Sequence, residues 1–160
     1  MFTAGLLAGC GGTDDEAPVA TATTTITTTV PAPNGASTEP VVWKGASTEV
    51  ELLTDVRAAR HPGYDRLVFE FRMGLPGYDV RYVEPPVRAD GSGDVVVVAG
   101  GVVLRVRMEP ALDADLTQES APRTYTGPTR FSPDTAAVVE LVRAGAFEAV
   151  LTWAIGVSTI

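Results

Sequence analysis

Five arginines are the side chains of this sequence best suited to hold a ligand, and they fall in segments that alternate polar and apolar residues: Arg66, Arg72, Arg81, Arg105 and Arg107. Successive side chains of a β-strand point to opposite faces, so this spacing predicts that all five project from the polar face of a sheet. A guanidinium binds carboxylates and phosphates through paired, planar hydrogen bonds. Such a face would suit an acidic polymer or peptide.

Acidic side chains between these arginines support a second interpretation of the same face. Glu70, Asp79 and Glu109 are interleaved with the five arginines. Opposite charges on neighbouring strands commonly pair with each other, and each pair contributes about 0.2–1 kcal/mol. Charge pairing without any ligand is therefore the more common outcome for a face of this kind, and ligand binding is the alternative.

Catalytic machinery is not indicated by the sequence. His61 is the only histidine and Cys10 the only cysteine. As a general base His61 would need an orienting acid and a nucleophile; Asp65 is near in sequence, but no motif places a serine or cysteine beside it. A zinc site fails for lack of ligands. We therefore expect a protein that is not an enzyme and needs no cofactor.

Two acidic loops resemble ion-binding segments only superficially. Asp113, Asp115, Thr117 and Glu119 have the odd-position spacing of a calcium loop, but glutamine and threonine stand where that loop needs its glycine and its last glutamate. A solvated acidic loop is the preferred interpretation. The segment 90–94, with alternating Asp, Ser and Asp, is interpreted as Asx-type turns that satisfy backbone donors.

Composition limits the classes of protein to which this chain can belong. It has 160 residues, of which 45% are hydrophobic, enough for one core and one domain. Its formal net charge of −8 argues against nucleic acid as a partner, because phosphate binding needs a basic surface. No apolar run reaches the roughly eighteen residues of a spanning helix, so membrane attachment would need a lipid or a processed leader.

The elements that position the arginines are predicted to be short strands separated by turns. Pro-Gly pairs predict chain reversals at His61–Tyr64 and at Leu75–Tyr78. Between them, alternation places Leu67, Phe69, Phe71 and Met73 on one face, and after the second turn Tyr78, Val80 and Tyr82 follow the same rule. We expect an antiparallel sheet with one dry face and one wet face.

The remaining segments continue this pattern. A first strand is predicted at 50–57, with Val50, Leu52, Thr54 and Val56 on one face, and the glycines at 100–101 predict a hairpin between 95–98 and 102–108. In the returning strand Val102, Leu104, Val106 and Met108 face inward. At the end of the chain Phe147, Ala149, Leu151, Trp153 and Ile155 share a face, with Trp153 in the core. About eight short strands without a long amphipathic helix predict an all-β antiparallel sandwich.

Several motifs, in this order, resemble the AMIN-like domain of actinobacterial cell-envelope lipoproteins. They are the two Pro-Gly-Tyr turns, the 89–93 Ala-Asp-Gly-Ser-Gly segment, the 124–128 Thr-Tyr-Thr-Gly-Pro segment and the 147–153 segment that ends in Leu-Thr-Trp. The resemblance runs from about Trp43 to Ile155. It implies a β-sandwich that binds or targets cell-wall material and brings no catalytic residues. The alternative is a protein-interaction domain of the envelope, without glycan affinity, whose edge strands pair with a partner protein.

The N-terminal third is predicted to anchor this domain. Residues 7–10, Leu-Ala-Gly-Cys, look like the end of a lipobox, so Cys10 is the expected lipidation site and 1–10 a truncated signal peptide; the alternative is a stray thiol. Because 1–9 lacks lysine and arginine, we expect the true start upstream or a fragmentary chain.

The rest of the domain organisation follows from composition. Residues 11–40 are expected to be a disordered Thr/Ala/Pro-rich stalk, and 41–160 the folded domain, incomplete at its C-terminus and leaving a sheet edge uncovered there. The predicted location is the cell envelope, anchored by lipid to the outer face of the cytoplasmic membrane, or alternatively secreted. The expected partner is a cell-wall polymer or an envelope protein.

Overall fold

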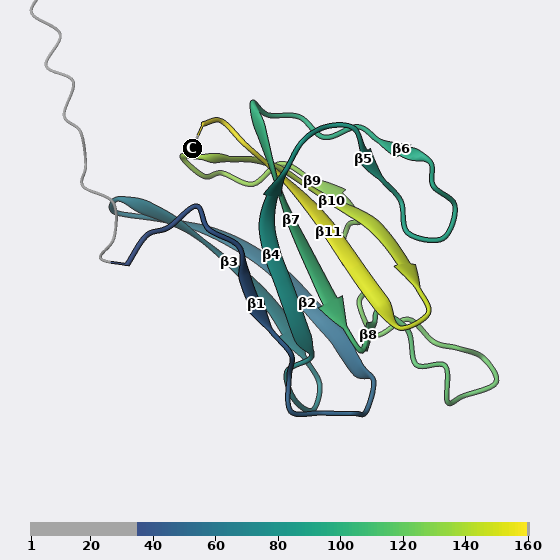
Figure 1. Ribbon diagram of the computed structural model, residues 1–160. Coiled ribbons are helices and arrows are strands. Elements are labelled where there is room, and N and C mark those ends of the chain that lie inside the picture. The colour runs from purple at the N-terminus through teal and green to yellow at the C-terminus, as the bar shows by residue number, and fades with distance from the viewer. Residues whose placement is uncertain (1–34, 160) are drawn as a thin grey trace, which may run out of the picture.

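A computed structural model describes residues 35–159 and shows two β-sheets packed face to face (Figure 1). No helix occurs in this part of the chain, and therefore none long and apolar enough to cross a membrane. The all-β, antiparallel sandwich predicted from the sequence is confirmed. Cys10 and most of the predicted stalk lie outside the described residues.

The larger sheet has six strands and the smaller one three. In spatial order the larger sheet contains β1 (Val41–Trp43), β4 (Gly77–Val83), β7 (Val102–Glu109), β11 (Val150–Val157), β10 (Val138–Phe147) and β9 (Arg130–Phe131). The smaller sheet contains β3 (Tyr64–Phe71), β2 (Glu51–His61) and β8 (Ala111–Leu112), and β8 runs parallel to β2. A separate ribbon pairs β5 (Val87–Arg88) with β6 (Val95–Val96).

The core between the two sheets is centred on Trp153, which has no exposed surface. Its ring meets Phe69 of the smaller sheet at a centroid distance of 6.0 Å and Tyr125 at 5.8 Å, both edge-on, the geometry that aromatic quadrupoles favour. Leu151 and Ile155 flank it on the same face of β11 and are also fully buried. The prediction that Trp153 belongs to the core is confirmed.

Alternation correctly predicted most inward-facing side chains. Leu67, Phe69 and Phe71 of β3 pack against the core, as do Tyr78, Val80 and Tyr82 of β4 and the predicted inward residues of β7. Met73 is a wrong prediction and is 86% exposed, because β3 ends at Phe71. Phe147 and Ala149 also leave the inward face: Glu148 and Ala149 have φ values of 49° and 59° and make the turn between β10 and β11.

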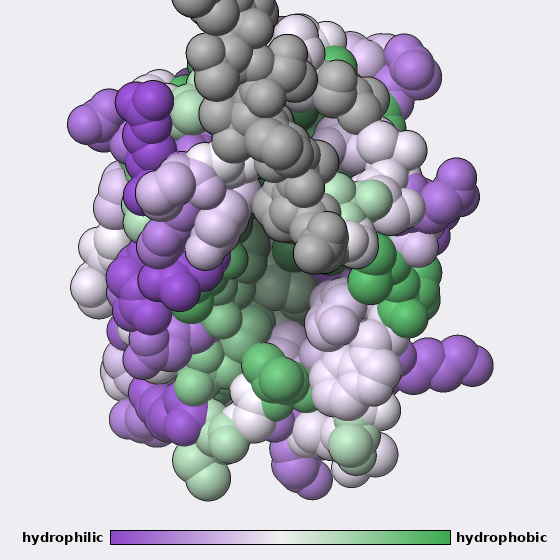
Figure 2. Space-filling view, turned by 90° about the vertical axis from the view of Figure 1, so that its left-hand side faces the viewer, coloured by the Kyte–Doolittle hydropathy of each residue, from purple (hydrophilic) through white to green (hydrophobic). Residues whose placement is uncertain are grey.

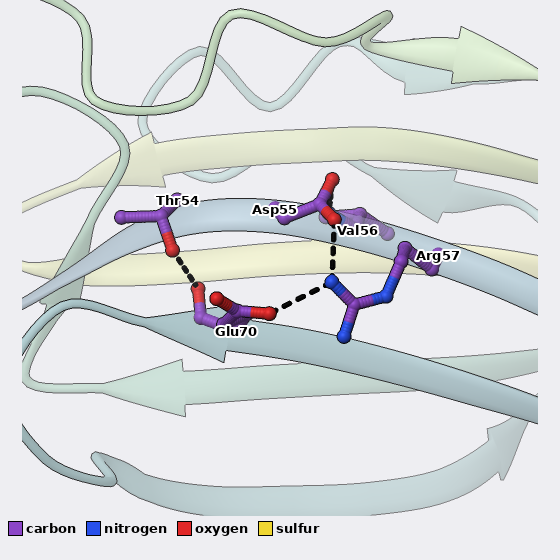
Figure 3. Close-up of polar contacts among 5 residues, drawn as sticks. All are labelled: Thr54, Asp55, Val56, Arg57 and Glu70. Carbon is purple, nitrogen blue, oxygen red and sulfur yellow. Dashed lines mark hydrogen bonds and ion pairs between the residues drawn. The ribbon is translucent and has the colours of Figure 1, made fainter.

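A bulge interrupts the first long strand, so its predicted face is not continuous. The register between β2 and β3 shifts between Leu53 and Asp55. Leu53 and Val56, three residues apart, are therefore both buried, whereas strict alternation would place them on opposite faces. At this bulge the Asp55 carboxylate accepts a 2.9 Å hydrogen bond from the backbone nitrogen of Val56, and Figure 3 shows both residues with their neighbours.

One of the two predicted Pro-Gly reversals is confirmed and the other is wrong. Gly63 has φ +86° and closes the tight turn between β2 and β3. Gly77 instead begins β4, which pairs with β1 and β7 and not with β3, so residues 72–76 carry the chain from one sheet to the other. A Cβ on Gly77 would lie 2.7 Å from the carbonyl oxygen of Lys44 and 2.8 Å from that of Glu109. Close backbone packing, not a turn, requires this glycine.

The outer face of the six-stranded sheet is not wholly wet, contrary to prediction. A second small core on this face joins Val87 of the β5–β6 ribbon to Val103, Ala144 and Ala154 of the sheet, and all four are buried. The hairpin expected at 100–101 does not form, because β6 pairs with β5 while β7 pairs with β4 and β11. The 84–101 segment thus covers part of the sheet instead of extending it.

The C-terminal strand is not at an edge. β11 pairs with β10 on one side and β7 on the other, and the edges of this sheet are β1 and β9. The last strand therefore does not form an uncovered edge, because it is inserted between β7 and β10; that the domain is incomplete at its C-terminus stays a prediction.

Candidate functional site

The structure divides the five candidate arginines between two sheets. Arg81, Arg105 and Arg107 lie on the six-stranded sheet, where Arg81 is directly opposite Arg105 and Asp79 opposite Arg107. Arg66 lies in β3 and Arg72 just beyond it, on the other sheet. The single face expected from alternation does not form, because the chain changes sheets between β3 and β4.

Charges on the smaller sheet pair with one another, as the charge-pairing interpretation predicts. One guanidinium nitrogen of Arg57 lies 2.7 Å from both the Asp55 and the Glu70 carboxylates (Figure 3). The Thr54 hydroxyl donates a 3.1 Å hydrogen bond to the Glu70 carbonyl oxygen, which joins the two strands at the bulge. These side chains are about half exposed, so the pairs are weak and leave no preformed binding site.

Two of the three arginines on the larger sheet are also paired. Arg81 binds both carboxylate oxygens of Asp79, at 2.6 Å and 2.5 Å, and Arg107 binds Glu109 at 2.6 Å. Each partner is two residues away on the same strand and therefore on the same face. Arg105 differs, because its Nε is buried and has no hydrogen-bond partner among the described residues.

Arg105 lines a polar cavity of about 330 Å³ on the outer face of the six-stranded sheet. β7 and β11 form its floor with Arg105, Arg107 and Thr152, and the chain that leaves β4 forms its wall and roof. The roof and wall residues are Val83, Glu84, Pro86, Val87, Arg88 and Asp90. The cavity therefore exists because the 84–101 segment folds back over the sheet (Figure 1).

Three lining side chains have buried polar atoms without partners: Arg105 Nε, Asp90 Oδ2 and Thr152 Oγ1. Thr152 is only 2% exposed. An unsatisfied buried polar group costs roughly 1–3 kcal/mol, so each of the three needs a water or a ligand group in the cavity as its partner. Together they offer a cation, an anion and a hydroxyl.

Local backbone contacts hold Asp90 in place. The Ala89 nitrogen donates to the Asp94 carbonyl at 2.8 Å, and the Arg88 guanidinium donates to the Gly93 carbonyl at 3.0 Å. The predicted turn chemistry is present at Ser92, whose hydroxyl accepts from the Asp94 nitrogen at 3.3 Å. Asp90 itself makes no such turn. The sequence does not predict that Asp90 and Thr152 line a common cavity, because no local pattern marks either residue.

The prediction of a solvated acidic loop after β8 holds only in part: residues 116–123 are exposed, but Asp113 and Asp115 are buried and have structural partners. Asp113 is 4% exposed and binds both Arg123, at 2.9 Å, and Arg143, at 2.7 Å. Asp115 is 7% exposed and accepts hydrogen bonds from Thr117 and Gln118. Within residues 35–159 no cluster of three or more His, Cys, Asp or Glu side chains could hold a metal ion.

His61 and Asp65 do not form a catalytic pair. The His61 ring stacks on Tyr64 at a centroid distance of 4.9 Å. The Asp65 carboxylate accepts hydrogen bonds from the backbone nitrogens of 136–138, at 2.6–3.0 Å. Burial raises the pKa of this carboxyl, but the three backbone donors outweigh burial and leave it below its usual value. Asp65 therefore fastens the β2–β3 hairpin to the start of β10.

A second cavity, of about 320 Å³, lies between the two sheets and is apolar. Its lining comes from β3, β4, β7 and the segment between β3 and β4: Leu67, Phe69, Phe71, Leu75, Pro76, Tyr78, Val80, Leu104, Val106 and Met108. Figure 2 shows a hollow with apolar residues on this side of the molecule. β3 borders it and pairs only with β2, so its other backbone edge is free within the described structure.

Comparison with known proteins gives one finding. The family model of the AMIN-like domain matches residues 51–159, which covers both cavities. No curated protein and no solved structure matches this chain.

Proposed function

Because this chain belongs to the AMIN-like domain family, whose members are envelope-associated binding or targeting modules without catalysis, we propose that it binds an acidic cell-wall polymer at the polar cavity of its six-stranded sheet. The observation that carries this proposal is the unpaired Arg105 on the cavity floor. Arg81 and Arg107 lie on the same face but are paired with Asp79 and Glu109, so Arg105 is the arginine of this face that is available to a ligand.

The overall negative charge of the chain limits where an acidic polymer can bind. A net charge of −8 repels an acidic polymer from most of the surface, so attraction must be local. A guanidinium without a carboxylate partner provides such a point, because it need not break an existing pair before it binds a polymer carboxylate or phosphate.

Attachment to the membrane through Cys10 would place this site in the envelope. The lipobox-like Leu-Ala-Gly-Cys at 7–10 supports diacylation of Cys10, and two acyl chains anchor a protein stably where one does not. The domain would then lie at the outer face of the cytoplasmic membrane. Without acylation the same domain would be secreted.

A sedimentation assay with purified cell-wall polymer tests the binding proposal. The full chain should be retained, and retention should fall as salt is raised from about 0.05 to 0.5 M, because screening weakens contacts between charges at a surface. Arg105→Gln should reduce retention. Arg66→Gln removes the same charge from the other sheet and should leave retention unchanged. Equal retention of both variants, or none for the wild type, would contradict the proposal.

The free edge of β3 and the adjoining apolar cavity favour a second candidate, the docking of an extended segment of an envelope protein. Such a segment would pair with the β3 backbone and place alternate apolar side chains in the cavity. Binding of this kind would survive high salt. It would be lost in Leu75→Asp, since Leu75 lines the cavity yet is 60% exposed, while Arg105→Gln would not affect it.

A further inference from the structure

The polar cavity presents opposite charges that do not neutralise each other. Arg105 and Asp90 both line it, and neither takes part in an ion pair or a side-chain hydrogen bond within the described part of the chain. Arg105 Nε and Asp90 Oδ2 are both buried. Each side chain as a whole is only partly buried, but these two atoms are enclosed and need a water or a ligand group as their hydrogen-bond partner.

A simple anion and a simple cation would each satisfy only one of these two side chains. A carboxylate or phosphate bound at Arg105 would leave Asp90 without a partner in the cavity. An ammonium bound at Asp90 would leave Arg105 without a partner. A ligand with both charges a few ångströms apart satisfies both, and the Thr152 hydroxyl adds a third hydrogen bond.

We infer that this cavity binds the zwitterionic head of an α-amino acid, with the ligand carboxylate on Arg105 and the ligand ammonium on Asp90. The inference deepens the proposed function, since the site is the same, by naming the group that is recognised. An α-amino acid carries its carboxylate and ammonium on one carbon, which suits two opposite protein charges that line one cavity without forming an ion pair with each other. A cavity of about 330 Å³ has room for this head and part of a side chain.

Titration with small probes tests the inference on the full 160-residue chain. L-Alanine and D-alanine should shift the backbone NMR resonances of the 89–94 loop and of β7. Propionate lacks the ammonium, ethylamine lacks the carboxylate and N-acetylalanine has its nitrogen neutralised, so each should bind at least about tenfold more weakly than alanine. If propionate or N-acetylalanine bound as tightly as alanine, or if neither alanine bound, the inference would be overturned.

Variants connect the binding to the three side chains. Asp90→Asn and Arg105→Gln should each weaken alanine binding about tenfold or more, and Thr152→Val less. Arg81→Gln is the matched control: Arg81 lies opposite Arg105 on the next strand, is already paired with Asp79 and does not line the cavity. Unchanged alanine binding in Asp90→Asn would overturn the inference.

Two further experiments distinguish a polymer-borne ligand from a free amino acid, and failure of this inference from failure of the proposed function. An N-blocked peptide with a diaminopimelate residue, whose side chain ends in the same zwitterion, should bind if the group is borne by a polymer; binding of alanine alone would identify a free amino acid. If wall polymer is retained through Arg105 while Asp90→Asn has no effect, the zwitterion is excluded and the proposed function stands. If alanine binds but polymer is not retained, polymer binding is excluded and the inference of a zwitterion site stands.

Discussion

Gly145 of β10 lies directly against Asp90 of the loop that roofs the polar cavity: a Cβ on Gly145 would be 2.8 Å from the Asp90 nitrogen and 2.9 Å from its Cβ. A Cβ closer than 3.0 Å to another heavy atom requires one of the two to shift, and backbone atoms shift less easily than the end of a flexible side chain. Gly145 of the six-stranded sheet thus fixes the position of Asp90, the residue whose carboxylate we propose binds the ligand ammonium.

Gly145→Ala should displace the 89–94 loop and weaken alanine binding without unfolding the domain. Overpacking of this kind costs about 1–3 kcal/mol, within the stability of a typical domain. Calorimetric titration and urea denaturation measure the two effects. A variant that kept wild-type affinity would show that the position of Asp90 does not matter for binding.

Asp113→Asn should destabilise the domain by about 3–5 kcal/mol, because it leaves Arg143 partly buried without its carboxylate partner. Only 5% of the Asp113 side chain and 20% of the Arg143 side chain are exposed. The matched control is Glu109→Gln, which breaks a pair whose side chains are 51% and 39% exposed and should cost at most about 1 kcal/mol. If urea denaturation showed that the two variants lose similar amounts of unfolding free energy, the structural role of Asp113 would be contradicted.

Asp115 should contribute stability that acid removes. Hydrogen bonds from the Thr117 hydroxyl and from Gln118 outweigh the burial of this carboxyl, and together with the charge of Arg72 they lower the pKa of Asp115 from 3.8 to about 2. A depressed folded-state pKa stabilises the fold above the unfolded value, and the contribution is lost as pH falls through the folded value.

The test compares wild type with Thr117→Val, which removes the largest cause of that shift. Their difference in unfolding free energy should be constant above pH 3.8 and should shrink as pH falls from there to about 2. Urea denaturation at a series of pH values measures it. A difference that stayed the same across this range would mean that the hydrogen bond does not act through the ionised carboxylate.

Cys10→Ala should release the protein from the membrane. Expressed in its host from an upstream start that supplies a positively charged leader, the wild-type chain should enter the detergent phase on phase partitioning, because diacylation gives stable anchorage. The variant should remain in the aqueous phase. If both partitioned into water, Cys10 would not be an anchor and secretion would be the better account.

The sequence by itself determined the features that depend on neighbours along the chain. Period-two alternation identified the inward side chains of β3, β4 and β7, and Pro62-Gly63 marked the turn between β2 and β3. Trp153 was assigned to the core by the same rule. These predictions succeed because strand pleating and turn geometry act over two to four residues, which is the range over which a pattern can be read.

Tertiary structure alone decided which strands pair and which charges remain free. Two Pro-Gly-Tyr segments are identical in sequence, yet one makes a turn and the other starts a strand, because Gly77 must pack against the carbonyls of Lys44 and Glu109. Asp90, Arg105 and Thr152 come from a loop and two strands and share one cavity only after the 84–101 segment folds over the sheet. Residues 15 and 47 positions apart come to line one cavity through packing, for which no local pattern exists.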